Sequence, residues 1–124
     1  MNKAVWSGLG WNPDTPVIDI LRDFGRYYLG DRYADDFAQG LLALERNWQG
    51  PLLTNEGVYA TLAQFQTMER GASQATLKNW RFQQALYRAY YDAYVRARLI
   101  RETELEAQAN DALREAGAVG SLAA

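Results

Sequence analysis

The sequence predicts an all-α fold, arranged as a four-helix bundle-like domain with a long C-terminal helix. Apolar residues recur at three- and four-residue steps through most of the 124 residues, which is the period of helices packed on one side. Glycine or proline interrupts this pattern near residues 30, 50 and 71. From Gln74 to Ala116 there is neither glycine nor proline, so no strong helix breaker lies in that stretch.

One helical domain is expected over residues 1–116, followed by a flexible tail over 117–124. The first fifteen residues contain two glycines and a proline, and we expect them to be irregular. Thr15 followed by Pro16 predicts the N-cap and first position of a helix over about 16–29. Gly30 predicts the end of that helix.

A second helix is expected over about 31–49, between Asp31 as a cap and the pair Gly50-Pro51 as a stop. Gly40 lies inside it, which favours the close approach of another helix. A third helix is expected over about 55–70, where Asn55 can cap its start. Its apolar residues fall on one side of the helix, which we expect to face the core: Val58, Leu62, Phe65 and Met68.

The fourth helix is expected over about 74–116, with Ser73 as its cap. The apolar and tyrosine residues of its first half cover more than one stripe, which predicts several packing neighbours. Beyond Arg101 the sequence is strongly polar, with only a thin apolar line through Leu105, Ala109, Ala112 and Leu113. We expect this second half to project, to fray or to pair with another copy.

Composition excludes several classes of function. Thirteen basic residues against fifteen acidic ones give a net charge of −2, which disfavours binding to nucleic acid. The chain has no cysteine and no histidine, so disulfides, thiolate chemistry and Ser-His-Asp arrangements are all excluded. No stretch reaches the length of a membrane span or a signal peptide, which predicts no membrane association and a cytoplasmic location for the chain as written.

The strongest candidate for a catalytic group is Asp92, which lies among tyrosines with Arg88 and Arg96 four residues away on either side. In the favoured interpretation these residues form ion pairs within one helix. In the alternative, a partly desolvated Asp92 acts as a base or binds a hydroxyl, and arginine stabilises negative charge. We expect no metal and no cofactor; a metal would need oxygen ligands only, which favours Mg²⁺ or Mn²⁺.

Four tryptophans could form a platform for sugars. We expect Trp48 and Trp80 to pack in the core, because both fall on apolar helical faces. Trp6 and Trp11 lie in the stretch expected to be irregular, and they are the better candidates for contact with a ligand or partner.

Several motifs resemble one region of large bacterial glycoside hydrolases, the helical region that follows the catalytic (β/α)₈ barrel in the α-glucuronidase and hexosaminidase-like group. The motifs are Trp11-Asn12-Pro13-Asp14, the stretch from Ile20 to Gly30, that from Gly40 to Trp48 and that from Asn79 to Asp92. The resemblance implies a helical domain without the barrel, so it implies no catalytic residue for this chain. It also implies that the chain is a fragment or a detached domain, whose parent glycosidase could be exported.

Three hypotheses follow for function. The leading one is a non-catalytic helical domain or fragment, derived from a glycoside hydrolase, that acts in packing and forms a homo-oligomer through its tyrosine-rich helix. The second is a small hydrolase that uses carboxylates, with or without Mg²⁺ or Mn²⁺, on a phosphodiester or a glycoside. The third is a helical adaptor that binds another protein in a groove.

Overall fold

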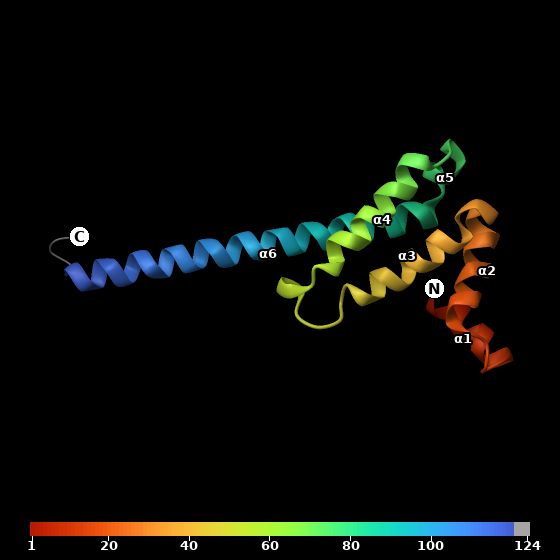
Figure 1. The fold of residues 1–124 in the computed structure, drawn as a ribbon, viewed down its shortest axis with the longest axis horizontal. Helices are drawn as coiled ribbons and strands as arrows, with labels where there is room; N and C mark the ends of the chain where they lie inside the picture. Colours follow the sequence, from red (N-terminus) through yellow and green to blue (C-terminus); the bar gives the residue numbers. More distant parts are fainter. Residues whose placement is uncertain (121–124) are drawn as a thin grey trace.

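The structure is a computed structural model that describes residues 1–120, and within this range its regular elements are all helical. The fold is all-α with a long C-terminal helix, as predicted, although it has six α-helices in the described range rather than four. Figure 1 shows a body from which the second half of α6 projects. The elements are α1 (Asn2–Trp11), α2 (Val17–Leu29), η1 (Asp31–Tyr33), α3 (Ala34–Arg46), η2 (Leu52–Thr54), α4 (Gly57–Gly71), α5 (Gln74–Lys78) and α6 (Trp80–Val119).

Helix α1 occupies the stretch that was expected to be irregular, and that expectation is wrong. Gly8 lies in this helix where a Cβ atom would come within 2.7 Å of the Ile20 side chain. The missing side chain lets α1 lie against α2. Packing between the two helices therefore offsets the low intrinsic helix propensity of glycine.

Helix α2 begins and ends close to its expected bounds, whereas α3 is shorter than expected. Pro16 is the N-cap of α2 rather than its first residue, and its carbonyl accepts a hydrogen bond from the Asp19 amide at 3.1 Å. The helix expected over 31–49 is shorter, because residues 31–33 form a 3-10 turn and α3 ends at Arg46. Residues 47–49 continue as turns, so Asn47 leaves the helix and faces the interior.

The helix expected over 74–116 is broken at Asn79, which separates α5 from α6. Asn79 has an extended backbone, and its Oδ1 accepts a hydrogen bond from the Arg81 amide at 3.0 Å. Its Nδ2 donates to the Tyr28 carbonyl of α2 at 2.8 Å. An asparagine side chain competes with the helical backbone for hydrogen bonds, so this residue caps a new helix instead of continuing the old one. Ser73 caps α5, as predicted for its position.

The core lies where α3, α4 and the first half of α6 meet. Its apolar cluster consists of Tyr33, Phe37, Leu44, Phe65, Met68, Phe82, Ala85 and Ala89. At Gly40 a Cβ atom would come within 2.8 Å of the Phe65 ring. The close approach of a helix at Gly40 is therefore confirmed, and the neighbour is α4.

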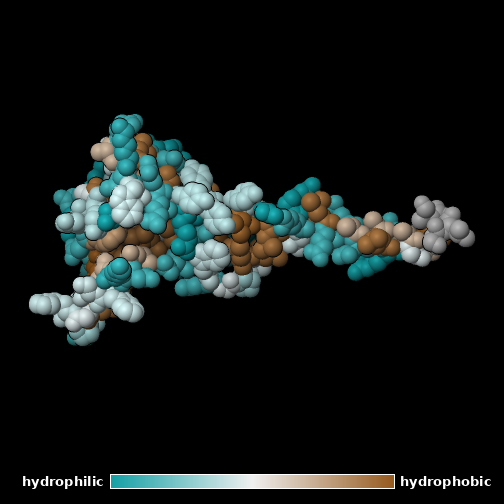
Figure 2. All heavy atoms as spheres, turned by 180° about the vertical axis from the view of Figure 1, so that it is seen from behind, coloured by the Kyte–Doolittle hydropathy of each residue, from teal (hydrophilic) through white to brown (hydrophobic). Residues whose placement is uncertain are grey.

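Helix α6 continues without a break to Val119, so the polar second half projects as a helix (Figure 1). Every residue from 101 to 115 is exposed. Figure 2 shows hydrophobic and hydrophilic surface side by side along this projection. Residues 117–119 of the expected tail are helical, and residues 121–124 of it lie outside the described part of the chain. None of the described helices is long and apolar enough to cross a membrane.

Candidate functional site

Asp92 lies inside the body, in the part of α6 that packs on α4. The residue is only 2% exposed. Its Oδ2 accepts a hydrogen bond from Asn47 Nδ2 at 2.9 Å and lies 3.5 Å from Arg88 Nε. Its Oδ1 is buried, and no residue in the described part of the chain donates a hydrogen bond to it. The ion pair with Arg88 is therefore confirmed, and the main hydrogen bond comes from a residue distant in sequence.

Asn47 connects three elements through its side chain and backbone. Its Oδ1 accepts a hydrogen bond from the Thr61 hydroxyl of α4 at 3.0 Å, while its Nδ2 reaches Asp92 on α6. Its backbone carbonyl accepts from Asn55 Nδ2 at 3.1 Å. The residue is 2% exposed, and each of these bonds satisfies a polar group that is removed from water.

Arg96 does not pair with Asp92, so the second expected ion pair is wrong. Its guanidinium donates to the carbonyls of Leu52 and Leu53, at 3.1 and 3.0 Å, and lies over the Tyr59 ring at 4.7 Å. Those carbonyls belong to η2, and the Leu52 carbonyl also accepts a hydrogen bond from the Asn55 amide at 3.2 Å. Arg96 therefore fastens the connection between α3 and α4 to α6.

Four of these residues form a polar cluster that joins the turn after α3 to α4 and α6, and we call it the Asp92 cluster: Asn47, Thr61, Arg88 and Asp92. A general base must come within hydrogen-bond reach of its substrate. The Asp92 side chain is 1% exposed, so no substrate reaches it in this conformation. The geometry favours a structural role for the cluster.

Sequence reasoning did not identify Asn47, although it identified Asp92 and both arginines. The available signal was an asparagine three residues before Gly50-Pro51, because asparagine near the end of a helix favours turns and loop contacts. The partner on α6 is 45 residues away, and no local pattern encodes that distance.

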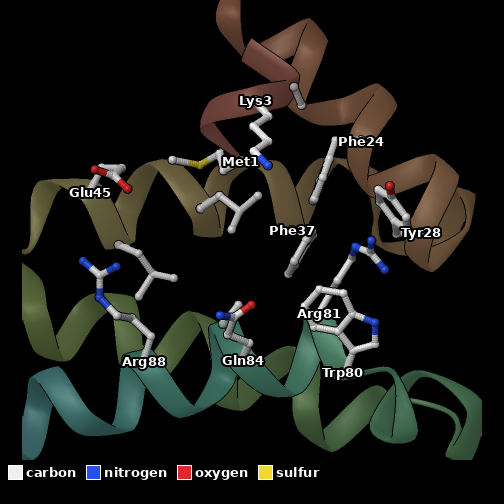
Figure 3. A pocket seen from close by; sticks show the side chains of 14 residues that line it. Met1, Lys3, Phe24, Tyr28, Phe37, Glu45, Trp80, Arg81, Gln84 and Arg88 are labelled. Atoms are coloured by element: carbon white, nitrogen blue, oxygen red, sulfur yellow. The ribbon is translucent and has the colours of Figure 1, made fainter. Parts of the chain in front are cut away.

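A second feature is an open groove of about 730 Å³ between α1, α2, α3 and α6, shown in Figure 3. Apolar side chains make its floor and charged ones its rim, so it offers both apolar contact and charge. The floor includes Phe24, Phe37, Leu41, Leu44 and Ala85, and the rim includes Lys3, Glu45, Arg81 and Arg88.

At one end of the groove, Arg81 lies over the Tyr28 ring at 3.5 Å and over the Trp80 ring at 4.2 Å. The guanidinium is thus held between two aromatic faces, which fixes its position. Figure 3 shows Arg88 and Glu45 toward the other end.

The tryptophans lie outside the core. Trp48 and Trp80 are 55% and 60% exposed, so the expectation that they pack in the core is wrong. Trp48 follows the end of α3, so it does not share the buried face of that helix, and an arginine covers part of each ring. Trp6 and Trp11 are also exposed, on α1.

The carboxylates of the described residues do not gather into a metal site. Within residues 1–120 there is no group of three or more acidic side chains placed to hold a metal ion. Asp35 is paired with Arg22 at 2.7 Å, and this hydrogen bond raises the pKa of the Arg22 guanidinium above its usual value.

A third feature is a row of exposed side chains on α6, which we call the long face. It consists of Trp80, Gln84, Tyr87, Tyr91, Tyr94, Arg98, Glu102, Leu105, Ala109, Ala112, Ala116 and Val119. At its centre Arg98 Nε donates to Glu102 Oε1 at 2.6 Å, and this bond raises the pKa of Arg98 above its usual value. In the described chain no other helix covers this row, because its members are exposed or, for Ala116, half-exposed.

Three comparisons with known proteins give no relative. No family model, curated protein or solved structure matches the chain. The functional conclusion therefore depends on the three features above.

Proposed function

We propose that the chain is a non-catalytic helical association domain, and that it acts by packing against a second copy through α6. The projecting half of α6 supports this most directly. Every residue from 101 to 115 is exposed, on a helix that is otherwise anchored in a packed body.

A single helix in water gains little from its own hydrogen bonds, and most helices in proteins are stabilised by packing. The projecting part of α6 has no such packing within the described chain, yet its apolar line includes Leu105 and Leu113, which are 46% and 69% exposed. The tyrosines of the first half add large apolar surface beside it. Burial of this apolar surface against a partner lowers the free energy of the protein in water.

The motifs given above support a further part of the proposal, namely that the domain derives from the helical region of a glycoside hydrolase. We expect the reading frame upstream of Met1 to continue into sequence that encodes a barrel. A stop codon and a ribosome-binding site directly upstream would contradict the fragment form of this derivation, while leaving a detached domain and self-association untouched.

The burial of Asp92 supports a non-catalytic function over the hydrolase alternative. A carboxylate that acts on a phosphodiester or a glycoside, alone or with Mg²⁺ or Mn²⁺, must be accessible to its substrate. Hydrolysis that is lost in Asp92→Asn without a loss of stability would contradict the proposal.

Sedimentation velocity at tens of micromolar tests the association. We expect a dimer for the natural sequence and a shift towards monomer for Tyr94→Glu, which places a charge on the long face. Tyr27→Glu is the matched control, because Tyr27 is exposed on α2 far from that face in sequence. A compact monomer for the natural sequence, or equal effects of the two variants, would contradict the proposal.

The groove supports a second candidate function, a helical adaptor that binds another protein. Its apolar floor and charged rim are typical of sites for a peptide or a helix. A pulldown is expected to recover a different protein, with less recovered by Lys3→Glu, which reverses a charge at the rim. Recovery of copies of the chain alone would count against the adaptor.

A further inference from the structure

The long face forms one straight row along the whole of α6. Its members follow one another at steps of three or four residues, from Trp80 to Val119, and the mean step is close to the 3.6-residue turn of a helix. A strict seven-residue repeat would drift around a straight helix, but this row does not. A second straight helix can therefore lie along it for its full length, roughly 60 Å at 1.5 Å per residue.

The two halves of the long face differ in side-chain size. The first half contains large aromatic residues: Trp80, Tyr87, Tyr91 and Tyr94. The second half contains small and aliphatic residues: Leu105, Ala109, Ala112, Ala116 and Val119. Two copies in parallel would place large against large and small against small. Two antiparallel copies would place the large aromatic side chains opposite small or aliphatic ones, which is how close-packed interfaces interdigitate.

The charges favour the same arrangement. Arg98 and Glu102 lie at equal distances on either side of Ile100. If the two-fold axis passes at the level of Ile100, Arg98 of each copy lies opposite Glu102 of the other. In a parallel pair each would face its own kind, which is repulsive.

The projecting half as a whole is acidic, with two arginines against five acidic residues from Arg101 to Val119. In the antiparallel arrangement this half lies along the first half of the other copy's α6, which has three arginines against one aspartate from Trp80 to Arg96. A net negative half therefore lies beside a net positive half at each end of the pair, whereas a parallel pair would place like charge beside like charge.

We infer that two copies of this chain pair through the long faces of α6, antiparallel, with the two-fold axis at Ile100 and with Tyr91 opposite Ala109. This inference depends on the proposed self-association and adds its geometry. Eight aromatic side chains, each burying about half of the ~150–250 Å² available to it, contribute roughly 600–1,000 Å². With the aliphatic residues added, the interface reaches the ~1,000 Å² that a specific one needs.

Single-cysteine variants test the register, because the natural chain contains no cysteine. We expect an oxidised mixture of Tyr91→Cys and Ala109→Cys to form a covalent dimer, while neither variant does so alone. Ala107→Cys is the matched control for Ala109→Cys, since two residues along the helix turn the side chain by ~200°, to the opposite side. Tyr91→Cys mixed with Ala107→Cys should give no covalent dimer.

A distance measurement on a label outside the long face does not depend on a cysteine at the interface. A spin label at Ala118→Cys, on the opposite side of α6, should give a distance of ~50 Å or more between copies in the antiparallel pair. In a parallel pair the distance should be below ~30 Å, because packed helices lie 8–10 Å apart.

Each outcome separates the geometry from the proposed function. A dimer by sedimentation in which Ala109→Cys crosslinks to itself, or in which the labels at residue 118 lie close together, overturns the antiparallel register and leaves self-association standing. A dimer without the crosslink between residues 91 and 109 also overturns the register. A monomer by sedimentation overturns the proposed function, and this inference with it.

Discussion

The carboxylate of Asp92 and the amide of Asn47 share a hydrogen bond in a region closed to solvent. A buried carboxylate is costly unless other groups compensate its charge. Asn47 and Arg88 provide that compensation, and Thr61 holds Asn47 in turn. Asn47 is central to this arrangement, because its removal takes away the hydrogen bond to the Asp92 carboxylate and the acceptor for the Thr61 hydroxyl.

At this scale we predict that Asn47→Ala lowers the free energy of unfolding by about 1.5–3 kcal/mol, because it removes a hydrogen bond to a buried charged group. Urea denaturation followed by circular dichroism measures the change. Asn110→Ala is the matched control, since Asn110 is exposed on α6 and off the long face, and we expect less than about 0.5 kcal/mol there. Equal effects of the two substitutions would contradict a structural role for the cluster.

Helices α3 and α4 pack directly on each other, and Gly40 lies at a close contact between them. The Phe65 ring fills the space where a side chain at residue 40 would lie. Helix propensity alone favours alanine over glycine by up to ~1 kcal/mol, whereas overpacking a core costs ~1–3 kcal/mol. Packing is the larger effect here, since the ring is itself fully buried.

At the scale of elements we therefore predict that Gly40→Ala destabilises the protein by about 1–2 kcal/mol. Thermal unfolding measured by calorimetry gives the shift in Tm. Gly10→Ala in α1 serves as the control, because no atom lies within 4 Å of the added methyl group there, and we expect it to be neutral or slightly stabilising. A stabilised Gly40→Ala protein would show that α3 and α4 move apart at little cost.

The sequence correctly predicted those features of the helices that depend on residues close together in the chain. The stop at Gly30, the cap at Ser73 and the apolar face of α4 are all present in the structure. The break at Asn79 was missed, because one side-chain amide bond to the Tyr28 carbonyl, 51 residues away, contributes to it. Helix α1 was also missed, because it depends on a contact with another helix, in which Gly8 lies against the Ile20 side chain of α2.

The candidate site was predicted less well than the fold. Charge spacing on one helix identified Asp92 and Arg88, but it also predicted a pair with Arg96, whose guanidinium binds the carbonyls of η2 instead. Tertiary packing decided the difference, because the fold places the carbonyls of Leu52 and Leu53 where they accept hydrogen bonds from the Arg96 guanidinium. The spacing of charges along one helix cannot predict that groups distant in sequence will bind Arg96 in place of Asp92.

The whole molecule divides into a packed body and a projecting helix. The last buried residue of α6 is Arg96, and residues 101–115 are exposed. The body therefore contains the core and the Asp92 cluster, while the projection contributes surface alone. The two parts should respond differently to truncation.

We predict that a chain ending at Ile100 folds with nearly the same stability and no longer dimerises. At low protein concentration, where dimer formation contributes nothing, its free energy of unfolding should lie within ~1 kcal/mol of that of the full chain. Chemical denaturation measures the stability, and sedimentation velocity measures the association. Loss of the folded state on truncation, or dimers of unchanged affinity, would contradict this division.

Helix α6 is fixed at one end only. Its first half is held by α4 and by Arg96, and the rest can tilt about the point where the helix leaves the body. Residues 101–119 extend about 28 Å beyond that point, so a tilt of ~10° about that point moves the end of the helix by roughly 5 Å. A small repacking around Asn47 and Arg96 that tilts α6 therefore displaces the end of the helix by several ångströms.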